Sequence, residues 1–280
     1  MGVLGIDLGG SNLRVGLVEN NCLVKIESLP INKNENEDAV LNSILSLIKC
    51  FSNERIEGIG IGVPSIVDIE KGIVYDVQNI PSCKEIHLKD FLQDKFNLPV
   101  YINNDANCFV MGEKYFGKAK KFNNIVGLII GTGLGAGIII NNNLYTGNNC
   151  GAGEFGMIQY KNKNYEYFCS GQYFINEYQT KGEKLFELAK NGDNEATRIF
   201  SEFGSNIGEA IKAILYSIDP EIIVLGGSVS KSFKYFKNEM LSSMSDFAYS
   251  RTIDKIKIEV SEENNISVLG AASLCYNEFH

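Results

Sequence analysis

Short apolar runs that alternate with polar turns open the chain. Residues 3–6, 13–18 and 22–26 are apolar over lengths typical of strands, and Asn20-Asn21 between the last two predicts a tight hairpin. After a polar segment at 32–38, apolar residues recur at helical spacing from Leu41 to Ile48. The sequence therefore predicts three strands followed by a helix.

The same alternation continues towards the C-terminus. We predict strands at 58–63 and 100–103, a strand–turn–strand unit at 125–140, and further strands within 219–230 and at 256–260. Helical patterns lie between them, at 87–95, from Asp105 to Tyr115, at 196–214 and at 267–276. Strands that alternate with helices predict an α/β fold.

The unit at 125–140 repeats the design of the N-terminal hairpin, which favours two related domains. A length of 280 residues favours two domains as well. The sequence contains no Pro/Ser-rich linker, so we expect a hinge near 105–117. The expected domains are an N-terminal α/β domain at 1–110, completed by the C-terminal helix at 267–280, and a larger C-terminal α/β domain at 111–266.

Composition and charge narrow the class of protein. A formal net charge of −8 argues against nucleic acid or an anionic membrane surface as the main partner. The seven cysteines are odd in number and form no Cys-x-x-Cys pair, as in proteins of a reducing compartment. The chain starts without a basic region, and its longest uncharged run, 125–140, is shorter than the roughly 20 residues of a spanning helix. We therefore expect a cytoplasmic protein.

Three glycine-rich turns follow buried strands. Glycine lets the backbone approach a ligand, and successive amides of such turns form anion-binding nests. Any single one is more simply a turn, but three at strand ends favour a phosphate clamp. None fits the P-loop or the dinucleotide fingerprint. The turns are Gly9-Gly10-Ser11-Asn12, Gly131-Thr132-Gly133 and Gly226-Gly227-Ser228.

Two carboxylates are candidates for binding or catalysis. Asp105 follows Asn104 at a strand end, where the pair could cap a helix or Asp105 could act as a general base. Glu154 stands among glycines and is either a solvated loop charge or an acceptor for sugar hydroxyls. The only histidines, His87 and His280, lie near no other candidate ligand, so we expect no histidine catalyst.

Seven segments, in order, resemble the sugar kinases of the ROK family (repressor, open reading frame, kinase), which belong to the actin/hexokinase-like ATPases. They are GIDLGGSNLRVGLVE, GIGIGVPSIVD, VQNIPSCKEIHLKDFL, LPVYINNDAN, GLIIGTGLGAGI, GNNCGAGEFG and DPEIIVLGGSVS. The resemblance implies a two-domain, ribonuclease H-like α/β fold with mixed sheets and an active-site cleft between the domains. It also implies a homodimer.

The resemblance assigns roles to the candidate residues. Asp7 would help to hold magnesium, while Gly9, Gly10, Ser11 and Asn12 would cradle the phosphates of ATP. Thr132 and Gly133 would meet the phosphates from the other domain, and Gly226 and Gly227 would lie beside the adenosine. Asp105 would be the base that accepts the proton of the attacking sugar hydroxyl. Asn79, Asn104, Asp105 and Glu154 match sugar-binding positions of the family.

The chain departs from the family pattern at the zinc motif. Met157 replaces a histidine that binds zinc and contacts the sugar, and Cys169 stands alone where the family has several cysteines. Tetrahedral zinc needs four ligands, so we expect no zinc site. Glu177 would stand for the final glutamate of the motif, with a spacing that differs by one residue. Ser65 and Ala136 replace family glycines, and Ser65 would lie near the sugar.

These observations predict an ATP- and Mg²⁺-dependent kinase that phosphorylates a hexose, glucose or a close relative, at the 6-hydroxyl. Kinases for N-acetylmannosamine, N-acetylglucosamine, allose or fructose are the alternatives within the enzyme class. The alternative outside it is a non-catalytic sugar sensor, because the family contains repressors. The expected partners are a sugar and ATP, with no nucleic acid and no membrane.

Overall fold

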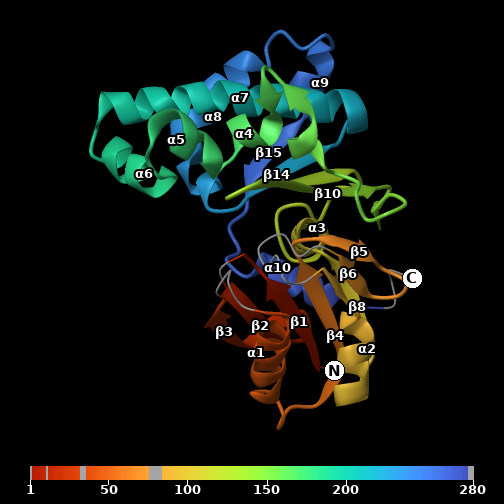
Figure 1. Cartoon of the computed structure of the whole chain (residues 1–280). Coiled ribbons are helices and arrows are strands. Elements are labelled where there is room, and N and C mark those ends of the chain that lie inside the picture. The colour runs from red at the N-terminus through yellow and green to blue at the C-terminus, as the bar shows by residue number, and fades with distance from the viewer. Residues whose placement is uncertain (1, 11, 32–35, 76–83, 277–280) are drawn as a thin grey trace. The chain divides into compact units, whose positions relative to one another are not determined.

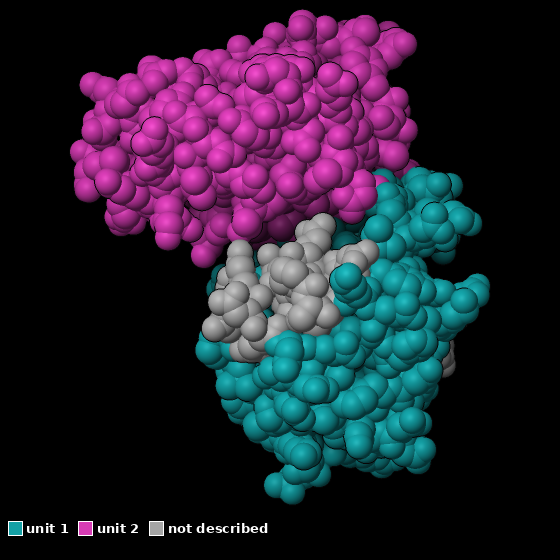
Figure 2. All heavy atoms as spheres, viewed as in Figure 1, with its two compact units in different colours: residues 1–121, 137–152, 262–280 teal, residues 122–136, 153–261 magenta. Residues whose placement is uncertain are grey.

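The computed structural model describes residues 2–10, 12–31, 36–75 and 84–276 (Figure 1). The chain divides into two compact units, which Figure 2 shows in different colours. Unit 1 comprises residues 1–121, 137–152 and 262–280, and unit 2 comprises 122–136 and 153–261. This partition differs from a single boundary near residue 110, because residues 137–152 belong to unit 1. Gly137 approaches α3 (Asp105–Tyr115) so closely that a Cβ would lie 2.3 Å from the Ala106 carbonyl oxygen.

A five-stranded mixed sheet forms the centre of unit 1. Strand β1 pairs antiparallel with β2 and parallel with β4, and β4 pairs parallel with β8. Asn20 and Asn21 join β2 to β3 with φ of 50° and 62°, as the tight hairpin requires. The order of strands is β3 (Cys22–Pro30), β2 (Asn12–Glu19), β1 (Gly2–Leu8), β4 (Ile56–Val63) and β8 (Val100–Asn104).

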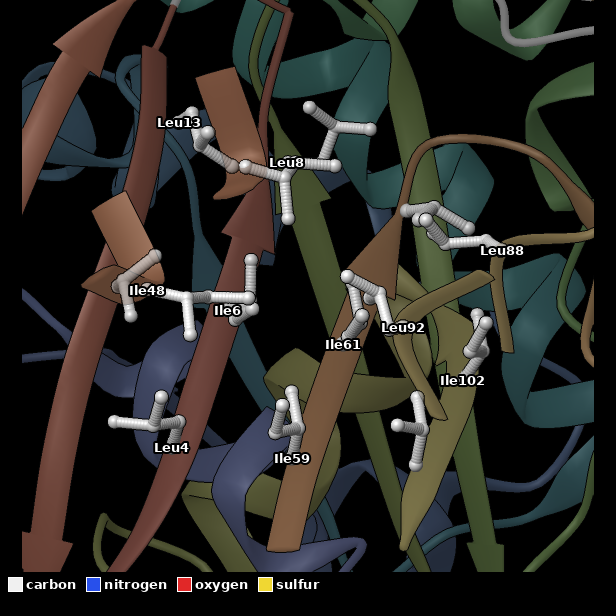
Figure 3. Packing of buried hydrophobic residues seen from close by; sticks show 14 of the residues in the cluster. Leu4, Ile6, Leu8, Leu13, Ile48, Ile59, Ile61, Leu88, Leu92 and Ile102 are labelled. Carbon is white, nitrogen blue, oxygen red and sulfur yellow. The ribbon is translucent and has the colours of Figure 1, made fainter. Parts of the chain in front are cut away.

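Successive side chains of a strand point to opposite faces of the sheet, and the two faces of this sheet pack against different helices. Leu4 and Ile6 of β1 and Ile59 and Ile61 of β4 point into one core together with Ile48 of α1 (Glu37–Lys49) (Figure 3). Helix α2 (Leu88–Phe96) closes this core. On the opposite face, glycines let α10 (Ile266–Ser273) touch the strands: a Cβ on Gly5 would lie 2.0 Å from the Val268 carbonyl oxygen. The C-terminal helix thus completes unit 1.

A smaller sheet and a short strand complete the polar end of unit 1. Strand β5 (Ile66–Asp68) pairs antiparallel with β6 (Ile73–Tyr75), which pairs with β7 (Glu85–Ile86). Strand β11 (Asn143–Leu144) pairs with the end of β10 (Leu134–Ile140), and the segment after β11 runs to Ala152 within this unit.

The second five-stranded sheet has the order β11, β10, β9 (Ile125–Ile130), β14 (Ile222–Gly226) and β15 (Lys257–Val260). Strands β9, β14 and β15 are parallel, and β10 and β11 form a hairpin as β2 and β3 do. Both sheets therefore place their first strand beside their second and fourth, in the topology that the repeated hairpin led us to expect. The fold is α/β with two domains, as predicted.

The rest of unit 2 is largely helical. The long helix α7 (Asn194–Ile218) buries Phe200, Phe203 and Ile207 along one face, as its apolar spacing predicts. In the described part of the chain, no helix has the length and apolar character that crossing a membrane requires. The other helices are α4 (Tyr165–Cys169), α5 (Gly171–Tyr178), α6 (Gly182–Lys190), α8 (Phe233–Ser243) and α9 (Ser250–Lys255), with 3-10 turns η1 (Phe155–Met157) and η2 (Val229–Ser232).

Candidate active site

The carboxyl ends of three parallel strands bring the polar residues of unit 1 together. Asp7 on β1 pairs in register with Gly62 on β4, and Gly62 pairs with Asn103 on β8. Neighbouring strands lie about 4.8 Å apart, so the backbones of Asp7 and Asn103 are separated by about 10 Å across this row. Asp105 follows two residues beyond Asn103. Segments far apart in the sequence thus place two carboxylates at one edge of the sheet.

Asp7 is buried and paired with Arg14. The Arg14 guanidinium donates from Nε and Nη2 to Oδ2 of Asp7, at 3.1 and 2.5 Å. Both hydrogen bonds end on the same oxygen, so Oδ1 is the atom of this carboxylate that a metal ion would approach. The turn after β1 is tight, since the Gly9 amide donates to the Asn12 carbonyl at 2.9 Å. Gly10 lies in this turn, and the prediction for Ser11 falls outside the described residues.

Helix α3 begins directly at the predicted catalytic pair. Asn104 is the N-cap residue, and its Oδ1 accepts from the Ala106 amide at 2.9 Å. Asp105 is the first helical residue, and its Oδ1 accepts from the same amide at 2.8 Å. Burial, followed by the negative charges of Asp105 and Asp7, raises the pKa of the Cys108 thiol well above its ordinary range. Both carboxylates therefore act electrostatically on one buried group of α3.

Ser65 stands next to this pair. Its hydroxyl donates to the Tyr75 carbonyl oxygen, and its own carbonyl accepts from Asn104 Nδ2 at 3.2 Å. The hydrogen bond from Asn104 links the start of α3 to the segment between β4 and β5. The prediction for Asn79 falls outside the described residues.

A buried amide cluster supports the strand end, and the sequence analysis did not single it out. Asn103 Oδ1 accepts from the Asn104 amide and from Asn107 Nδ2, each at 2.9 Å. The Cys150 thiol lies 3.4 Å from the same oxygen. The repeated asparagines of YINNDAN were the available signal for a hydrogen-bonded cluster. Nothing in the sequence indicated that Cys150 belongs to it, because Cys150 comes from a distant segment. The cluster fixes the backbone that presents Asp105.

Two of the predicted turns meet in unit 2. Gly226 ends β14 beside β9 in the parallel register, and Thr132 and Gly133 lie in the turn that leaves β9. A Cβ on Gly227, which has a φ of +85°, would lie 2.4 Å from the Ile130 carbonyl oxygen. Because these turns end adjacent parallel strands, their backbone amides gather at one edge of the second sheet. Such an edge suits a phosphate-bearing ligand.

A glutamate that the sequence analysis missed lies against this edge. Glu166 Oε2 accepts from the Leu134 amide at 3.0 Å, and a Cβ on Gly133 would lie 2.6 Å from the same oxygen. Desolvation, followed by the negative charge of Glu166, raises the pKa of Glu154. Glu154 and Glu166 are thus electrostatically coupled. Glycine at 133 was the available signal, since it makes room for this carboxylate.

Three further residues that the sequence analysis singled out belong to unit 2: Glu177, Met157 and Cys169. Glu177 is on the exposed surface of α5, where its Oε1 accepts from the Tyr167 hydroxyl at 2.8 Å. Met157, at the end of η1, is 52% exposed. Cys169 is buried and its thiol donates to the Asn206 carbonyl oxygen at 3.2 Å. Among the described residues, no group of three or more His, Cys, Asp or Glu is arranged to hold a metal ion.

A lysine organises the segment that carries Glu166. Lys161 Nζ donates to Asn206 Oδ1 at 2.7 Å and lies 5.0 and 4.9 Å from the ring centroids of Tyr160 and Phe168. The Tyr160 hydroxyl donates to the same Asn206 oxygen at 3.2 Å. We call Tyr160, Lys161, Phe168 and Asn206 the Lys161 cluster. It fastens α4 and the hairpin of β12 (Gln159–Tyr160) and β13 (Lys163–Asn164) to α7.

The chain belongs to the ROK family, whose model matches residues 3–278. It is 26% identical to a glucokinase of Thermotoga maritima, covering 97% of this chain and 96% of that protein. A β-glucoside kinase of Listeria monocytogenes is 28% identical, with coverage of 97% and 96%. A xylose repressor of Bacillus spizizenii is 33% identical over 79% of this chain and 62% of the repressor. The family thus includes both kinases and repressors.

A solved structure confirms the fold. The ROK family glucokinase of Streptomyces griseus in complex with glucose and AMPPNP has a TM-score of 0.84 to this chain. The match covers 98% of this chain and 99% of that one, at 22% identity. Two domains of this architecture are therefore the shared scaffold, and the sequence prediction of family and fold is confirmed.

Proposed function

We propose that the protein transfers the γ-phosphoryl group of ATP to the 6-hydroxyl of a hexose, glucose or a close relative. The observation that carries the proposal is the row Asp7–Gly62–Asn103, in which Asp7 and the strand that leads to Asp105 end at the same sheet edge. This arrangement supports a role for Asp7 on the metal–phosphate side and for Asp105 on the acceptor side. Phosphoryl transfer depends mainly on positioning and on neutralising charge, and such a row suits both needs.

Asp105 acts as the general base in this proposal. The oxygen of the sugar hydroxyl forms a bond to the γ-phosphorus, the bond from phosphorus to the bridging oxygen breaks, and ADP leaves. Asp105 takes the hydroxyl proton. Its Oδ1 accepts from the Ala106 amide, which orients the carboxylate, and Asn104 and Asn103 hold the strand end on which it stands.

Asp7 fits a role as magnesium ligand. Mg²⁺ in phosphoryl-transfer sites is bound through one or two carboxylates together with substrate phosphates, so a large protein cage is unnecessary. Arg14 holds Oδ2 and directs Oδ1 towards a ligand. When bound, the ion would neutralise charge on the phosphates. The amides of Gly10 and Asn12 would bind phosphate oxygens directly, whereas the Gly9 amide closes the turn on the Asn12 carbonyl.

The turns after β9 and β14 would supply further contacts to ATP. The turn at Thr132 and Gly133 offers a hydroxyl and backbone amides for phosphate, and Gly226 and Gly227 would lie beside the adenosine. Gly227 suits that place for two reasons. It has the left-handed backbone conformation that glycine adopts easily, and it has no side chain that would keep a ligand from the end of β14.

The proposal assigns the binding of the hexose to the side chains of Ser65, Asn79, Asn104 and Glu154. Of the glutamates that follow, Glu166 is the one coupled to Glu154, so the proposal gives Glu166 the place that the sequence analysis gave to Glu177. A raised pKa keeps a larger share of Glu154 protonated, in which state its carboxyl also donates a hydrogen bond.

The relatives support a sugar kinase, and they also support a second candidate function, that of a sugar sensor. A glucokinase and a β-glucoside kinase match this chain over nearly its whole length, which favours an enzyme that acts on sugars. The xylose repressor supports the alternative of a non-catalytic sugar sensor. The retained pair of Asp7 and Asp105 favours the enzyme. Kinases for N-acetylmannosamine, N-acetylglucosamine, allose or fructose are the alternatives in substrate.

The test is a coupled ADP-release assay with ATP and Mg²⁺ across hexoses and N-acetylhexosamines. We expect turnover of glucose or a close relative, with the product phosphorylated at the 6-hydroxyl by NMR. Preferred turnover of another sugar would replace glucose in the proposal. Sugar binding in calorimetry without turnover of any sugar would overturn the kinase and support the sensor.

A further inference from the structure

Ser65 lies in a buried turn between β4 and β5, at a position where the sequence departs from the glycine of the family pattern. The residue is 5% exposed, and its amide donates to the Val63 carbonyl oxygen at 2.9 Å. Its hydroxyl donates to the carbonyl oxygen of Tyr75 on β6. A serine hydroxyl carries one proton, so this bond leaves Ser65 without a hydroxyl proton for a sugar. Burial and the committed proton together point to an indirect role.

The hydroxyl of Ser65 closes one end of the β5–β6 hairpin. Ile66 pairs with Tyr75 in the antiparallel register, and Ser65 directly precedes Ile66. The bond from the side chain therefore extends the hairpin beyond its backbone pairing and ties the Ser65 backbone to β6. Glycine at this position would lack the bond and would have a larger range of backbone conformations. The serine thus restricts the direction in which its own carbonyl group points.

That carbonyl group orients Asn104, the N-cap residue of α3. The Ser65 carbonyl oxygen accepts from Asn104 Nδ2 at 3.2 Å, while Asn104 Oδ1 accepts from the Ala106 amide at 2.9 Å. Turning the side-chain amide over would set its NH2 group against the Ala106 N–H and its oxygen against the Ser65 carbonyl. The two bonds therefore allow one orientation, in which one N–H of Nδ2 and one lone pair of Oδ1 remain for a ligand.

Asp105 depends less on Ser65 than Asn104 does. Its Oδ1 accepts from the Ala106 amide at 2.8 Å, and the amide cluster around Asn103 supports the backbone that presents it. Neither contact involves Ser65. Loss of the Ser65 hydroxyl should therefore disturb the Asn104 side chain more than the carboxylate of the proposed base.

We propose that Ser65 is a positioning residue for the phosphoryl-acceptor sugar, which it helps to bind through the Asn104 side chain. The inference rests on the proposed function for the identity of the ligand, and it specifies how Ser65 contributes to hexose binding there. Ser65 holds the Nδ2 donor of Asn104 in place, whereas ATP is assigned to other residues. Loss of the Ser65 hydroxyl should therefore weaken the binding of the sugar and leave the use of ATP unchanged.

The first experiment measures ADP release by wild type and Ser65→Ala with the sugar that wild type prefers. We expect the KM for the sugar to rise about tenfold, while kcat and the KM for ATP change by less than about threefold. Ser273→Ala is the matched control: Ser273 is buried in α10 and its hydroxyl donates to the Gly270 carbonyl at 2.6 Å. The control should change each value by less than about twofold. An unchanged KM for the sugar in Ser65→Ala, or an equal effect of the two variants, would overturn the proposal.

A double-mutant cycle tests whether the effect of Ser65 passes through Asn104. Binding of the sugar is measured by calorimetry in wild type, in Ser65→Ala, in Asn104→Ala and in the double variant. In the Asn104→Ala background, Ser65→Ala should change the Kd by less than about twofold, because the group that Ser65 holds is already absent. Additive effects of the two substitutions would overturn the indirect role.

Hydrogen exchange separates this inference from the proposed function, since it needs no sugar. Ser65→Ala should speed exchange of the Ala106 amide by about threefold or more, because the Asn104 cap is less firmly held, and Ser273→Ala should leave it unchanged. If wild type binds a sugar without turnover, the kinase fails and a rise in Kd for Ser65→Ala supports the positioning role. If wild type binds no sugar, the proposed function fails, and the exchange rates decide whether Ser65 positions Asn104. An unchanged exchange rate in Ser65→Ala would overturn the inference in every case.

Discussion

Arg14 and Asp7 form a cross-strand pair in which the guanidinium donates two hydrogen bonds, at 3.1 and 2.5 Å, to one carboxylate oxygen. The two residues stand opposite each other in the β1–β2 register. The Asp7 side chain is only 10% exposed, so water solvates it poorly and Arg14 supplies the compensating charge. Arg14 Nη1 also donates to the Asn264 carbonyl at 3.1 Å. The pair thereby fixes the orientation of the proposed magnesium ligand.

Replacing Arg14 with methionine should weaken both the fold and the use of magnesium. Asp7 would keep a buried charge without its partner, so we expect a loss of about 2 kcal/mol in the free energy of unfolding, measured in urea. The Mg²⁺ concentration for half-maximal ADP release should rise about tenfold, which corresponds to about 1.4 kcal/mol. Arg55→Met is the control, because Arg55 is 91% exposed and pairs with Glu57 at the surface. Equal behaviour of the two variants would contradict this role of Arg14.

Asp105→Asn should abolish the proton transfer while preserving the helix start. Asparagine keeps the shape of the side chain and an oxygen for the Ala106 amide, so sugar binding in calorimetry should change little. We expect kcat to fall by a factor on the order of 10² or more, since the base is lost. Asp90→Asn, on the first turn of α2, is the matched control and should retain turnover. Full activity of the Asp105 variant would refute the assignment of the base.

Lys161→Met should loosen the Lys161 cluster. The variant loses a hydrogen bond to Asn206 and two ring contacts, for which we expect a loss of about 1–3 kcal/mol in the free energy of unfolding. Because α4 carries Glu166, the KM for the sugar should rise more than kcat falls. Lys163→Met is the control: Lys163 lies 5.7 Å from the Tyr167 ring and should contribute less than about 0.5 kcal/mol. If the KM for the sugar stays the same as in wild type, the Lys161 cluster does not contribute to sugar binding.

Glu154 should make stability depend on pH in a defined direction. Desolvation and the charge of Glu166 raise its pKa in the folded state above the ordinary 4.5, so folding favours the protonated carboxyl. This contribution is present in full below pH 4.5 and is lost as pH rises through the folded pKa. The contribution can be measured by urea unfolding of wild type and Glu154→Gln at a series of pH values from below 4.5 upwards. The stability of wild type relative to the variant should decrease with rising pH, and a constant or increasing difference would be the contrary result.

Much of the candidate site could be located in the sequence because its residues carry short-range signals. The polar cluster after β1, the Asn104-Asp105 pair at the end of β8 and the glycine turns after β9 and β14 all stand at strand ends, and apolar periodicity locates strand ends well. The choice between helix cap and base at Asp105 was open in the sequence. The structure shows Asn104 as the N-cap residue, and the hydrogen bond that Asp105 Oδ1 accepts from the Ala106 amide is compatible with a role of Asp105 as base.

Other parts were not predictable because they depend on contacts between distant segments. Glu166 lies against Gly133 and Leu134, whereas the spacing of the motif pointed to Glu177. Cys150 joins Asn103 across 47 residues of sequence, and residues 137–152 pack within unit 1 although they contain the end of β10 and the whole of β11, which are strands of the second sheet. Gly133 and the repeated asparagines of YINNDAN are signals for one side of two of these contacts, but the distant partner in each contact leaves no periodic or local pattern in the chain.

The sequence by itself determined the family, the two repeated α/β sheets and the turns that carry the candidate residues. These features follow from hydrophobic periodicity, from glycine and asparagine in tight turns, and from motifs that each lie within a few residues. The tertiary structure alone decided that Arg14 holds one oxygen of Asp7, that the charge of Glu166 acts on Glu154, and that the Cys150 thiol lies beside Asn103. Those relationships arise when strands pair and loops fold back, because packing then sets the distances between residues that the chain keeps far apart.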